Sequence, residues 1–338
     1  MDTGMDTGMD TGMDTAVAMR RAVALSHGVL GRTSPNPPVG AVVLDPCGHL
    51  VGEGATCPPG GPHAEVVALA QAGTAARGGT AVVTLEPCAH TGRTGPCTQA
   101  LLEAGIAGIV YAVPDPTARA GGGADVLRRA GVDVALLPTD VPPLRAWLHR
   151  QRTGRPFVTW KYAATLDGRT AAADGTSRWI TGHEARADVH RMRDEADAVL
   201  TGIGTVLADD PELTVRPSRD GRQPLRVVLD RQGRLPEGAK VSGPGSLVLS
   251  DGLDVVMTTL AGRGVVSLML ETGPTLSSAF LRAGLIDEVV GYLAPALLGS
   301  GPSAVSDLGV GTISDALRLH VVDVARVGPD VRLTLRRG

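Results

Sequence analysis

The chain has few aromatic residues, few cysteines and no large excess of either charge. Aromatic side chains make up 2% of its 338 residues, so a hydrophobic core must be built mainly from Ala, Val and Leu. Four cysteines are too few for a disulfide-stabilised scaffold and favour a reduced, cytoplasmic protein. No run of about 18 apolar residues occurs, which argues against a membrane-spanning segment.

The charge distribution argues against a nucleic-acid or membrane-surface protein. The net charge at pH 7 is −3, and four of the acidic residues lie in the first fifteen positions, so the remainder is nearly neutral. Those fifteen residues repeat Met-Asp-Thr-Gly and lack the basic start and apolar centre of a secretory signal. We expect residues 1–15 to form a disordered arm.

The rest of the chain alternates patterns that are typical of helices and strands. Such alternation predicts α/β domains, and the length favours two of them. A charged segment bounded by Pro and Gly divides the two series of elements. We predict a first domain over 16–145 with a mostly parallel sheet, a linker over 146–156 and a second domain over 157–338.

Residues with the spacing of a metal site occur in the first domain. A His-Ala-Glu motif contains His63 and Glu65, a strand-ending Glu-Pro-Cys contains Cys88, and a Gly-Pro-Cys places Cys97 at a predicted helix start. One imidazole and two thiolates are three zinc ligands that leave a fourth tetrahedral position open. The pattern predicts a Zn²⁺ site that activates water, with Glu65 as acid and base rather than ligand, as in nucleobase deaminases.

This interpretation sets a geometric condition and leaves alternatives open. Because residues i and i+2 of a helix point about 200° apart, His63 must precede the helix that carries Glu65. Cys88 and Cys97 could instead be ordinary thiols, a disulfide, or ligands of a structural zinc with His90 as the fourth. The remaining cysteines, Cys47 and Cys57, lie in turn-like contexts without a histidine at metal-ligand spacing, so we expect neither to take part.

The second half lacks the motif of a dinucleotide-binding Rossmann fold. Its nearest candidate has Gly202 and Gly204 but Leu207 where a third glycine is expected. Residues 270–284 instead have the pattern of a strand followed by a Gly-Pro-Thr helix start. Exposed backbone N–H groups at such a start can hold a phosphate.

Segments in both halves resemble the bifunctional deaminase/reductase family of riboflavin biosynthesis. The first half contributes three of them: SPNPPVGAVV, HAEVVAL and TLEPCAHTGRTGPC. The second half contributes three more: KYAATLDGRTAAADGTSRWITG, TGIGTVLADDPELTVR and LETGPTLSSAFLRAGLIDE. The resemblance covers residues 16–338 and includes the order of the two domains.

The resemblance implies a fold and an activity for each half. The first half would be a cytidine-deaminase-like α/β/α layered domain, and the second a dihydrofolate-reductase-like α/β domain. The cofactors would be Zn²⁺ and NADPH, and the substrates phosphoribosyl pyrimidines. The first half would deaminate 2,5-diamino-6-ribosylamino-4(3H)-pyrimidinone 5′-phosphate by hydrolysis, and the second would reduce the ribosyl group to ribityl.

The resemblance also assigns roles to individual residues. Zinc ligation is implied for His63, Cys88 and Cys97, and proton donation for Glu65. Contacts with NADPH are implied for Ala163, Trp179, Thr205, Asp209, Gly273, Pro274, Thr275, Leu276, Ser277, Ser278 and Ala279. Contacts with the substrate are implied for Ser177, Arg193, Leu213, Arg216 and Glu271.

The chemistry of several of these residues suits the assignment. Two arginines, Arg193 and Arg216, match the geometry of a phosphate. Lys161 and Asp209 are polar enough to assist protonation of the ring oxygen of the sugar. Taken without the resemblance, Trp179 could equally be an ordinary packing residue, and Arg193 could belong to a solvated helix face.

The chain departs from the pattern of related enzymes at three places. Eight residues, rather than the two of other zinc deaminases, separate Cys88 from Cys97, and the insert adds Arg93, which suits a phosphorylated substrate. Residues 117–124 are shorter than in the family, which puts the substrate contacts of that loop in doubt. Residues 217–262 are compact, and there we only suggest that Arg231 meets the 2′-phosphate of NADPH.

Two rival functions are less well supported by the residues. A nucleic-acid deaminase would need base-stacking aromatics and a basic track, which this composition lacks. A half-active protein that retains one site for structure would have lost some metal or acid/base residues, but all of them are present. We therefore expect a bifunctional enzyme, forming a homo-oligomer, with no nucleic-acid or membrane partner.

Overall fold

The computed structural model describes residues 12–90, 95–118 and 120–337, which divide into two compact units between residues 151 and 152. Most of the expected arm lies outside the described residues, but its last four residues do not. The Met13 N–H donates to the Gly48 carbonyl, and the Asp14 carboxylate accepts from the Ala16 N–H at the start of helix α1 (Thr15–Gly28). The expectation of disorder is therefore wrong for residues 12–15, because Asp14 caps a helix.

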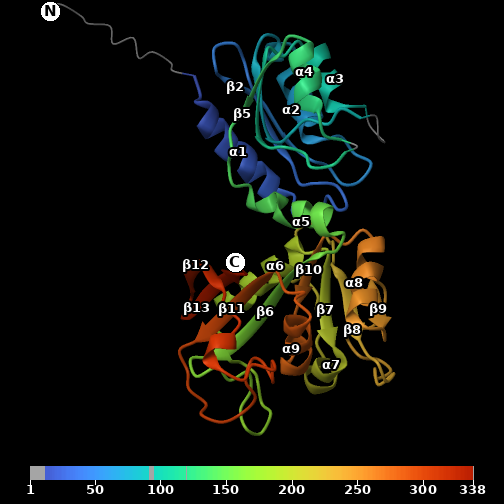
Figure 1. Cartoon of the computed structure of the whole chain (residues 1–338), viewed down its shortest axis with the longest axis vertical. Coiled ribbons are helices and arrows are strands. Elements are labelled where there is room, and N and C mark those ends of the chain that lie inside the picture. The colour runs from blue at the N-terminus through green and yellow to red at the C-terminus, as the bar shows by residue number, and fades with distance from the viewer. Residues whose placement is uncertain (1–11, 91–94, 119, 338) are drawn as a thin grey trace, which may run out of the picture. The chain divides into compact units, whose positions relative to one another are not determined.

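The first unit is built on a five-stranded sheet in the order β2-β1-β3-β4-β5. Figure 1 labels its two edge strands, β2 and β5. β1 pairs antiparallel with both β2 and β3, whereas β3, β4 and β5 pair in parallel. The expectation of a mostly parallel sheet holds only for β3, β4 and β5: a short turn makes the β1–β2 pair antiparallel, and the β1–β3 pair is antiparallel as well. The strands are β1 (Gly40–Leu44), β2 (Leu50–Ala55), β3 (Thr80–Leu85), β4 (Gly108–Val113) and β5 (Asp133–Leu136).

Helices cover both faces of this sheet. A Cβ on Gly40 would lie 1.9 Å from a backbone oxygen of α1, whereas one on Gly54 would lie 2.6 Å from a backbone oxygen of α2 (Ala64–Ala72). Gly40 and Gly54 point to opposite faces, because Gly54 is paired with Ala41, the residue after Gly40. The unit is therefore an α/β/α layered domain.

The remaining helices of the first unit follow the strands. They are α3 (Cys97–Glu103) and α4 (Gly123–Arg129), with the short 3₁₀ helices η1 (Gly73–Ala76) and η2 (Pro142–Leu144). A further helix, α5 (Arg145–Thr153), begins in this unit and contains the division after residue 151. Much of the segment expected as a linker, 146–156, is helical because it forms α5. Trp147 of this helix is buried.

The second unit contains an eight-stranded sheet in the order β12-β13-β11-β6-β10-β7-β8-β9. In this order, every neighbouring pair of strands from β11 through β6, β10, β7 and β8 to β9 is parallel. β13 pairs antiparallel with β11, and the edge strand β12 pairs antiparallel with β13. The strands are β6 (Phe157–Thr165), β7 (Ala198–Gly202), β8 (Leu225–Leu229), β9 (Ser246–Leu249), β10 (Ser267–Leu270), β11 (Glu288–Ala294), β12 (His320–Val327) and β13 (Asp330–Arg336).

Both faces of the second sheet are buried under helices. Leu268 and Leu270 of β10 pack into one hydrophobic cluster with α8 and α9, whereas Met269 between them packs into another with α6 and α7. This alternation follows from the two-residue period of a strand. The helices are α6 (His183–Glu195), α7 (Ile203–Asp209), α8 (Leu253–Gly262) and α9 (Pro274–Arg282), followed by the 3₁₀ helix η3 (Ile313–Asp315). In the described part of the chain, no helix is both long and apolar enough to span a membrane.

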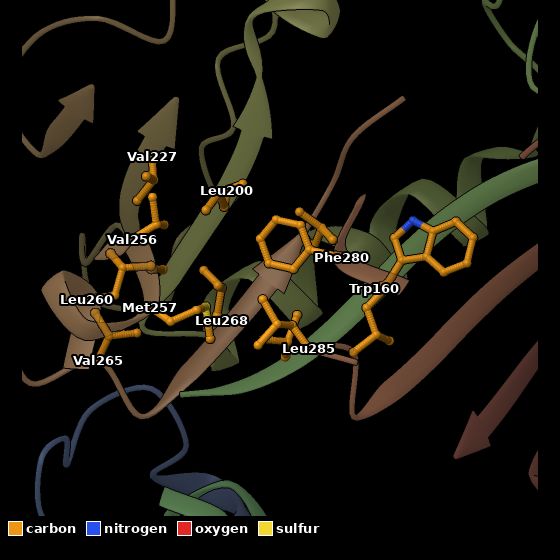
Figure 2. Packing of buried hydrophobic residues seen from close by; sticks show 14 of the residues in the cluster. Trp160, Leu200, Val227, Val256, Met257, Leu260, Val265, Leu268, Phe280 and Leu285 are labelled. Carbon is orange, nitrogen blue, oxygen red and sulfur yellow. The ribbon is translucent and has the colours of Figure 1, made fainter. Parts of the chain in front are cut away.

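The cluster beneath α8 and α9 shows how few aromatic rings the core needs. Figure 2 shows Phe280 among aliphatic side chains such as Leu200, Leu268 and Val256, with Trp160 at the margin of the group. Phe280 and Val256 are fully buried. Leu and Val therefore fill most of this volume, as the composition indicates.

Two adjacent valines of α8 provide a matched test of this packing. We expect Val256→Ala to lower the free energy of unfolding of the second unit by about 2 kcal/mol, because it removes two buried methyl groups. Val255→Ala, at a position 52% exposed, should change it by less than about 0.5 kcal/mol. Urea unfolding of both variants measures the difference, and equal effects would contradict the described face of α8.

Candidate functional site

The three predicted metal ligands of the first unit meet where separate elements begin or end. His63 is the N-cap residue of α2, Cys88 follows β3, and Cys97 is the first residue of α3. His63 Nδ1 lies 3.2 Å from Cys97 Sγ and 3.7 Å from Cys88 Sγ, and all three ligand atoms are within 4.8 Å of one another. As an N-cap, His63 stands outside the helix, which satisfies the geometric condition for a His-x-Glu pair.

These three atoms fit a tetrahedral zinc ion. Zinc bonds of about 2.0 Å to nitrogen and 2.3 Å to sulfur separate N and S ligands by roughly 3.5 Å. The distances from His63 to the two sulfurs bracket that value. The Cys97 N–H also donates to Cys88 Sγ at 3.4 Å, a contact that favours a thiolate. One imidazole and two sulfurs leave the fourth position to water or substrate.

The electrostatics of the cluster favour a thiolate at Cys88. A hydrogen bond from the Cys97 thiol, together with the His63 imidazole, lowers the pKa of Cys88 to about 4. The same contact with Cys88, together with burial, raises the pKa of Cys97. A thiolate is the form of cysteine that binds a divalent cation, so the polarity around Cys88 suits metal ligation.

Glu65 lies beside the ligands without belonging to the cluster. It is in the first turn of α2 and is 5% exposed. Burial raises the pKa of its carboxyl above the ordinary value. A buried carboxyl beside a metal site can hold a proton near neutral pH, which is what an acid/base group requires.

A cavity of about 590 Å³ in the first unit opens onto this cluster. His63, Glu65 and Cys88 contribute to its wall. Polar residues that the sequence analysis did not assign also line the cavity: Asn36, Thr56, Glu86, Asp115, Thr117 and Gln151. Two of these residues do lie in motifs noted in the sequence: Asn36 in SPNPPVGAVV and Glu86 in Glu-Pro-Cys. Thr117 begins the segment 117–124, where the chain departs from its family.

The other residues considered for the first site have less direct positions. His90 lines the cavity, and its buried Nδ1 has no hydrogen-bond partner in the described part of the chain. Arg93 lies outside the described residues.

The structure corrects one expectation about Cys47. The sequence analysis expected no histidine at metal-ligand spacing from this cysteine, but His49 and Asp45 share its turn. Hydrogen bonds within that exposed turn, including His49 Nδ1 to Asp45 Oδ2 at 3.0 Å, account for the grouping.

In the second unit, the predicted cofactor residues lie near the carboxyl ends of adjacent parallel strands. Ala163 is on β6, Thr205 is on α7 directly after β7, and Gly273 to Ala279 begin α9 directly after β10. Gly273 is the N-cap of α9, and its N–H donates to Thr205 Oγ1 at 3.2 Å. The sheet order β6-β10-β7 makes these segments neighbours.

Trp179 and Asp209 belong to the same region in different ways. The Trp179 side chain is 69% exposed, so the alternative that it is an ordinary packing residue is wrong. The centroid of its ring lies 4.4 Å from the Arg186 guanidinium, which is a cation–π contact. Asp209, at the end of α7, accepts from the Ser177 hydroxyl at 3.3 Å. One predicted cofactor residue and one predicted substrate residue are thereby in direct contact.

The predicted substrate residues Arg193 and Glu271 form a bidentate ion pair, with distances of 2.5 and 3.0 Å. The Arg193 side chain is 13% exposed, so a solvated helix face is the wrong interpretation. Lys161 Nζ lies 3.8 Å from Glu271 Oε2. Burial opposes ionisation of Glu271, but Arg193 and Lys161 outweigh it and lower its pKa to about 2. Burial in turn lowers the pKa of Lys161.

Leu213 and Arg216 lie on the segment after α7. Leu213 is buried with φ 55°, and Arg216 Nη1 pairs with Glu212 Oε2 at 2.6 Å on an exposed surface. The Arg216 backbone N–H approaches His190 Nδ1 at 3.2 Å, and His190 lies on the helix that carries Arg193. Arg216 thus offers an accessible cation on the segment that α6 supports.

Comparisons with known proteins match both units. The sequence model of the cytidine and deoxycytidylate deaminase zinc-binding region matches residues 14–113, and that of the RibD C-terminal domain matches residues 156–333. Riboflavin biosynthesis protein RibD of Mycobacterium tuberculosis is 50% identical over 326 residues, covering 94% of this chain and 96% of that protein. The Escherichia coli protein of the same name is 41% identical over 359 residues, covering 94% and 98%.

Solved structures agree with the sequence matches. RibD of Acinetobacter baumannii has a TM-score of 0.87 at 40% identity, covering 96% of this chain and 99% of that one. A diaminohydroxyphosphoribosylaminopyrimidine deaminase/5-amino-6-(5-phosphoribosylamino)uracil reductase of Thermotoga maritima has a TM-score of 0.86 at 34% identity, with the same coverage. Because these matches span both units in the same order, the chain belongs to the RibD family of bifunctional riboflavin-biosynthesis enzymes, which join a zinc-dependent deaminase to an NADPH-dependent reductase.

Proposed function

We propose that the two sites act in turn on one phosphorylated pyrimidine. The first unit hydrolyses an exocyclic amine of 2,5-diamino-6-ribosylamino-4(3H)-pyrimidinone 5′-phosphate and releases ammonia. The second unit reduces the ribosyl group of the product to ribityl with NADPH. The observation that carries the proposal is the convergence of His63, Cys88 and Cys97 beside buried Glu65 on one cavity.

In the first unit, His63, Cys88 and Cys97 hold zinc, which when bound supplies the Lewis acidity that makes water a nucleophile near neutral pH. Glu65 accepts a proton from that water and delivers it to the departing amine. Its burial suits this role, because a carboxyl that is neither strongly acidic nor solvated can both take and give a proton. The polar side chains of the cavity wall orient the pyrimidine ring.

In the second unit, NADPH supplies the hydride that is transferred to C1′ of the ribosyl group. The backbone N–H groups at the start of α9 bind cofactor phosphate, with Thr205 holding Gly273 in place. Exposed Arg216 binds the 5′-phosphate of the substrate, since a surface ion pair such as that with Glu212 is readily exchanged. Lys161 donates the proton that the ring oxygen takes up when the C1′–O bond opens.

We also propose that the enzyme is a cytoplasmic homo-oligomer of chains with the predicted domain boundaries. Its four cysteines, none in a disulfide in the described residues, suit a reducing compartment. Edge strand β12 exposes Val321, Val322 and Val324, of which two are 60% exposed. An edge strand with apolar side chains favours pairing with another chain, and a second copy supplies the same edge.

The metal site can be tested by removing one ligand. Cys88→Ala should reduce bound zinc from about one per chain to below roughly 0.1 and lower ammonia release at least about 10³-fold, because two donors hold zinc weakly. Elemental analysis and an ammonia assay on the same samples measure both. The control, Cys57→Ala, changes a thiol outside the cluster and should retain both properties. Ammonia release from a zinc-free Cys88→Ala protein would contradict the mechanism.

The reductase site can be tested through its buried carboxylate. Glu271→Gln should lower kcat/KM for NADPH oxidation at least about 100-fold, because it leaves Arg193 and Lys161 with an uncompensated buried charge. Ammonia release by the first unit should be unchanged. The matched control is Glu288→Gln, at the start of β11, where the carboxylate pairs with Arg336. Similar losses in both variants would argue against a role at the site.

The oligomer can be tested at its proposed edge. Val324→Lys should shift the chain to a smaller species in sedimentation velocity at micromolar concentration, because lysine on an edge strand opposes pairing. Val255→Lys, on the exposed face of α8, makes the same substitution and should leave the species unchanged. A wild-type chain that sediments as a monomer would contradict this part of the proposal.

A further inference from the structure

The carboxylate of Glu86 joins the metal-bearing loop to the loop between β4 and α4. Glu86 is 8% exposed. Its Oε2 accepts from the Asp115 N–H at 3.1 Å, and its Oε1 accepts from the N–H groups of Gly122 at 3.1 Å and Ala124 at 2.9 Å. The Glu86 N–H donates to the Val113 carbonyl at the end of β4. One side chain thus satisfies three backbone donors of a neighbouring segment.

Other contacts hold the same two segments together next to the zinc ligand Cys88. The Ala89 N–H donates to the Ala120 carbonyl at 3.2 Å. A Cβ on Gly123 would lie 1.8 Å from the Pro87 carbonyl oxygen, so the start of α4 lies directly against the metal-bearing loop. Cys88 is therefore flanked on both sides by residues that contact the β4–α4 segment.

The β4–α4 segment, residues 114–122, contributes polar groups to the cavity wall. Asp115 and Thr117 line the cavity, and Asp115 Oδ1 accepts from both the N–H and the hydroxyl of Thr117, at 2.8 and 2.6 Å. Gly121 and Gly122 end the segment, and a third consecutive glycine, Gly123, begins α4. Glycines lose the most backbone entropy on ordering, so this wall needs an anchor.

We propose that Glu86 is a positioning residue for deamination: it anchors the β4–α4 segment and thereby holds Asp115 and Thr117 in the orientation that binds the pyrimidine substrate. It acts on substrate binding and not on the metal, because its oxygens accept from backbone donors and it is absent from the ligand cluster. The inference rests on the proposed function, since it takes the zinc cavity to be the deamination site.

Both oxygens of Glu86 must accept hydrogen bonds, which makes glutamine the informative replacement. An amide has one accepting oxygen, and its NH₂ group would face at least one of the three backbone N–H donors. Glu86→Gln therefore keeps the shape of the side chain while removing an anchor at Asp115 or at Gly122 and Ala124. A carboxylate that accepts from backbone N–H groups forms the stronger, charge-assisted kind of hydrogen bond.

The experiment measures ammonia release, zinc content and reductase activity of the full-length chain for wild type and Glu86→Gln. We expect KM for the deaminase substrate to rise about tenfold or more, with kcat changed less than about threefold. Zinc should stay at about one per chain and NADPH oxidation should be unchanged. The control, Glu53→Gln, makes the same change in the same unit, where the carboxylate accepts from Arg21 at 2.8 Å, and should leave KM unchanged.

A double-mutant cycle separates positioning from a general loss of stability. If Glu86 acts through Asp115, Glu86→Gln should raise KM by less than about threefold in an Asp115→Ala background. Should Glu86→Gln fail to fold, Glu86→Asp is the second variant. It keeps both accepting oxygens on a shorter side chain, so KM should rise by a smaller factor than is expected for Glu86→Gln. An unchanged KM, a loss of zinc, or additive effects of the two substitutions would overturn the proposal.

Failure of the proposed function would give a different result. In that case the wild-type protein itself would release no ammonia with zinc bound, or would release it after the Cys88→Ala change. The proposal for Glu86 fails instead where the wild type is an active zinc-dependent deaminase and Glu86→Gln retains its KM, loses zinc, or combines additively with Asp115→Ala.

Discussion

The parallel pairing of β3 with β4 is the constraint on which the first site depends. It brings the ends of both strands, Leu85 and Val113, to the same edge of the sheet, so that the loops after them meet. One loop carries Cys88, and the other carries Asp115. The N-termini of α2 and α3 reach the same edge with His63 and Cys97. Parallel strands always present their carboxyl ends together, and here that edge collects both the metal ligands and the polar cavity wall.

The second unit uses the same arrangement for different chemistry. Its strands β6, β10 and β7 are parallel neighbours, and predicted cofactor residues follow each of them. The difference lies in charge: Arg193, Lys161 and Glu271 form a buried cluster in place of a metal site. Burying such charges is unfavourable unless each is paired, so the cluster keeps the ionic groups in fixed positions before a charged substrate arrives. The antiparallel strands β12 and β13 extend this sheet away from the site.

The elements that sequence patterns predicted best are those with a local cause. Helix starts at residues 64, 97 and 274 follow from a His, Pro or Gly before an apolar periodic segment, and the strands show short apolar runs. The errors have tertiary or turn-level causes. Asp14 caps a helix inside an apparently featureless acidic repeat. The antiparallel start of the first sheet depends on a short turn, and the Asp45-Cys47-His49 grouping arises because that turn folds side chains onto one side.

By itself, the sequence determined the types of residue at the first site, its ligand spacing and the order of the two domains. Metal ligation requires particular side chains in short motifs, and such motifs are visible without a fold. Only the tertiary structure decided which distant partners complete the sites: Glu86 with the segment beyond Asp115, and Arg193 with Glu271, 78 positions along the chain. Carboxylates and arginines occur throughout the surface of a protein, so their spacing carries no signal until strand pairing and helix packing bring specific ones together.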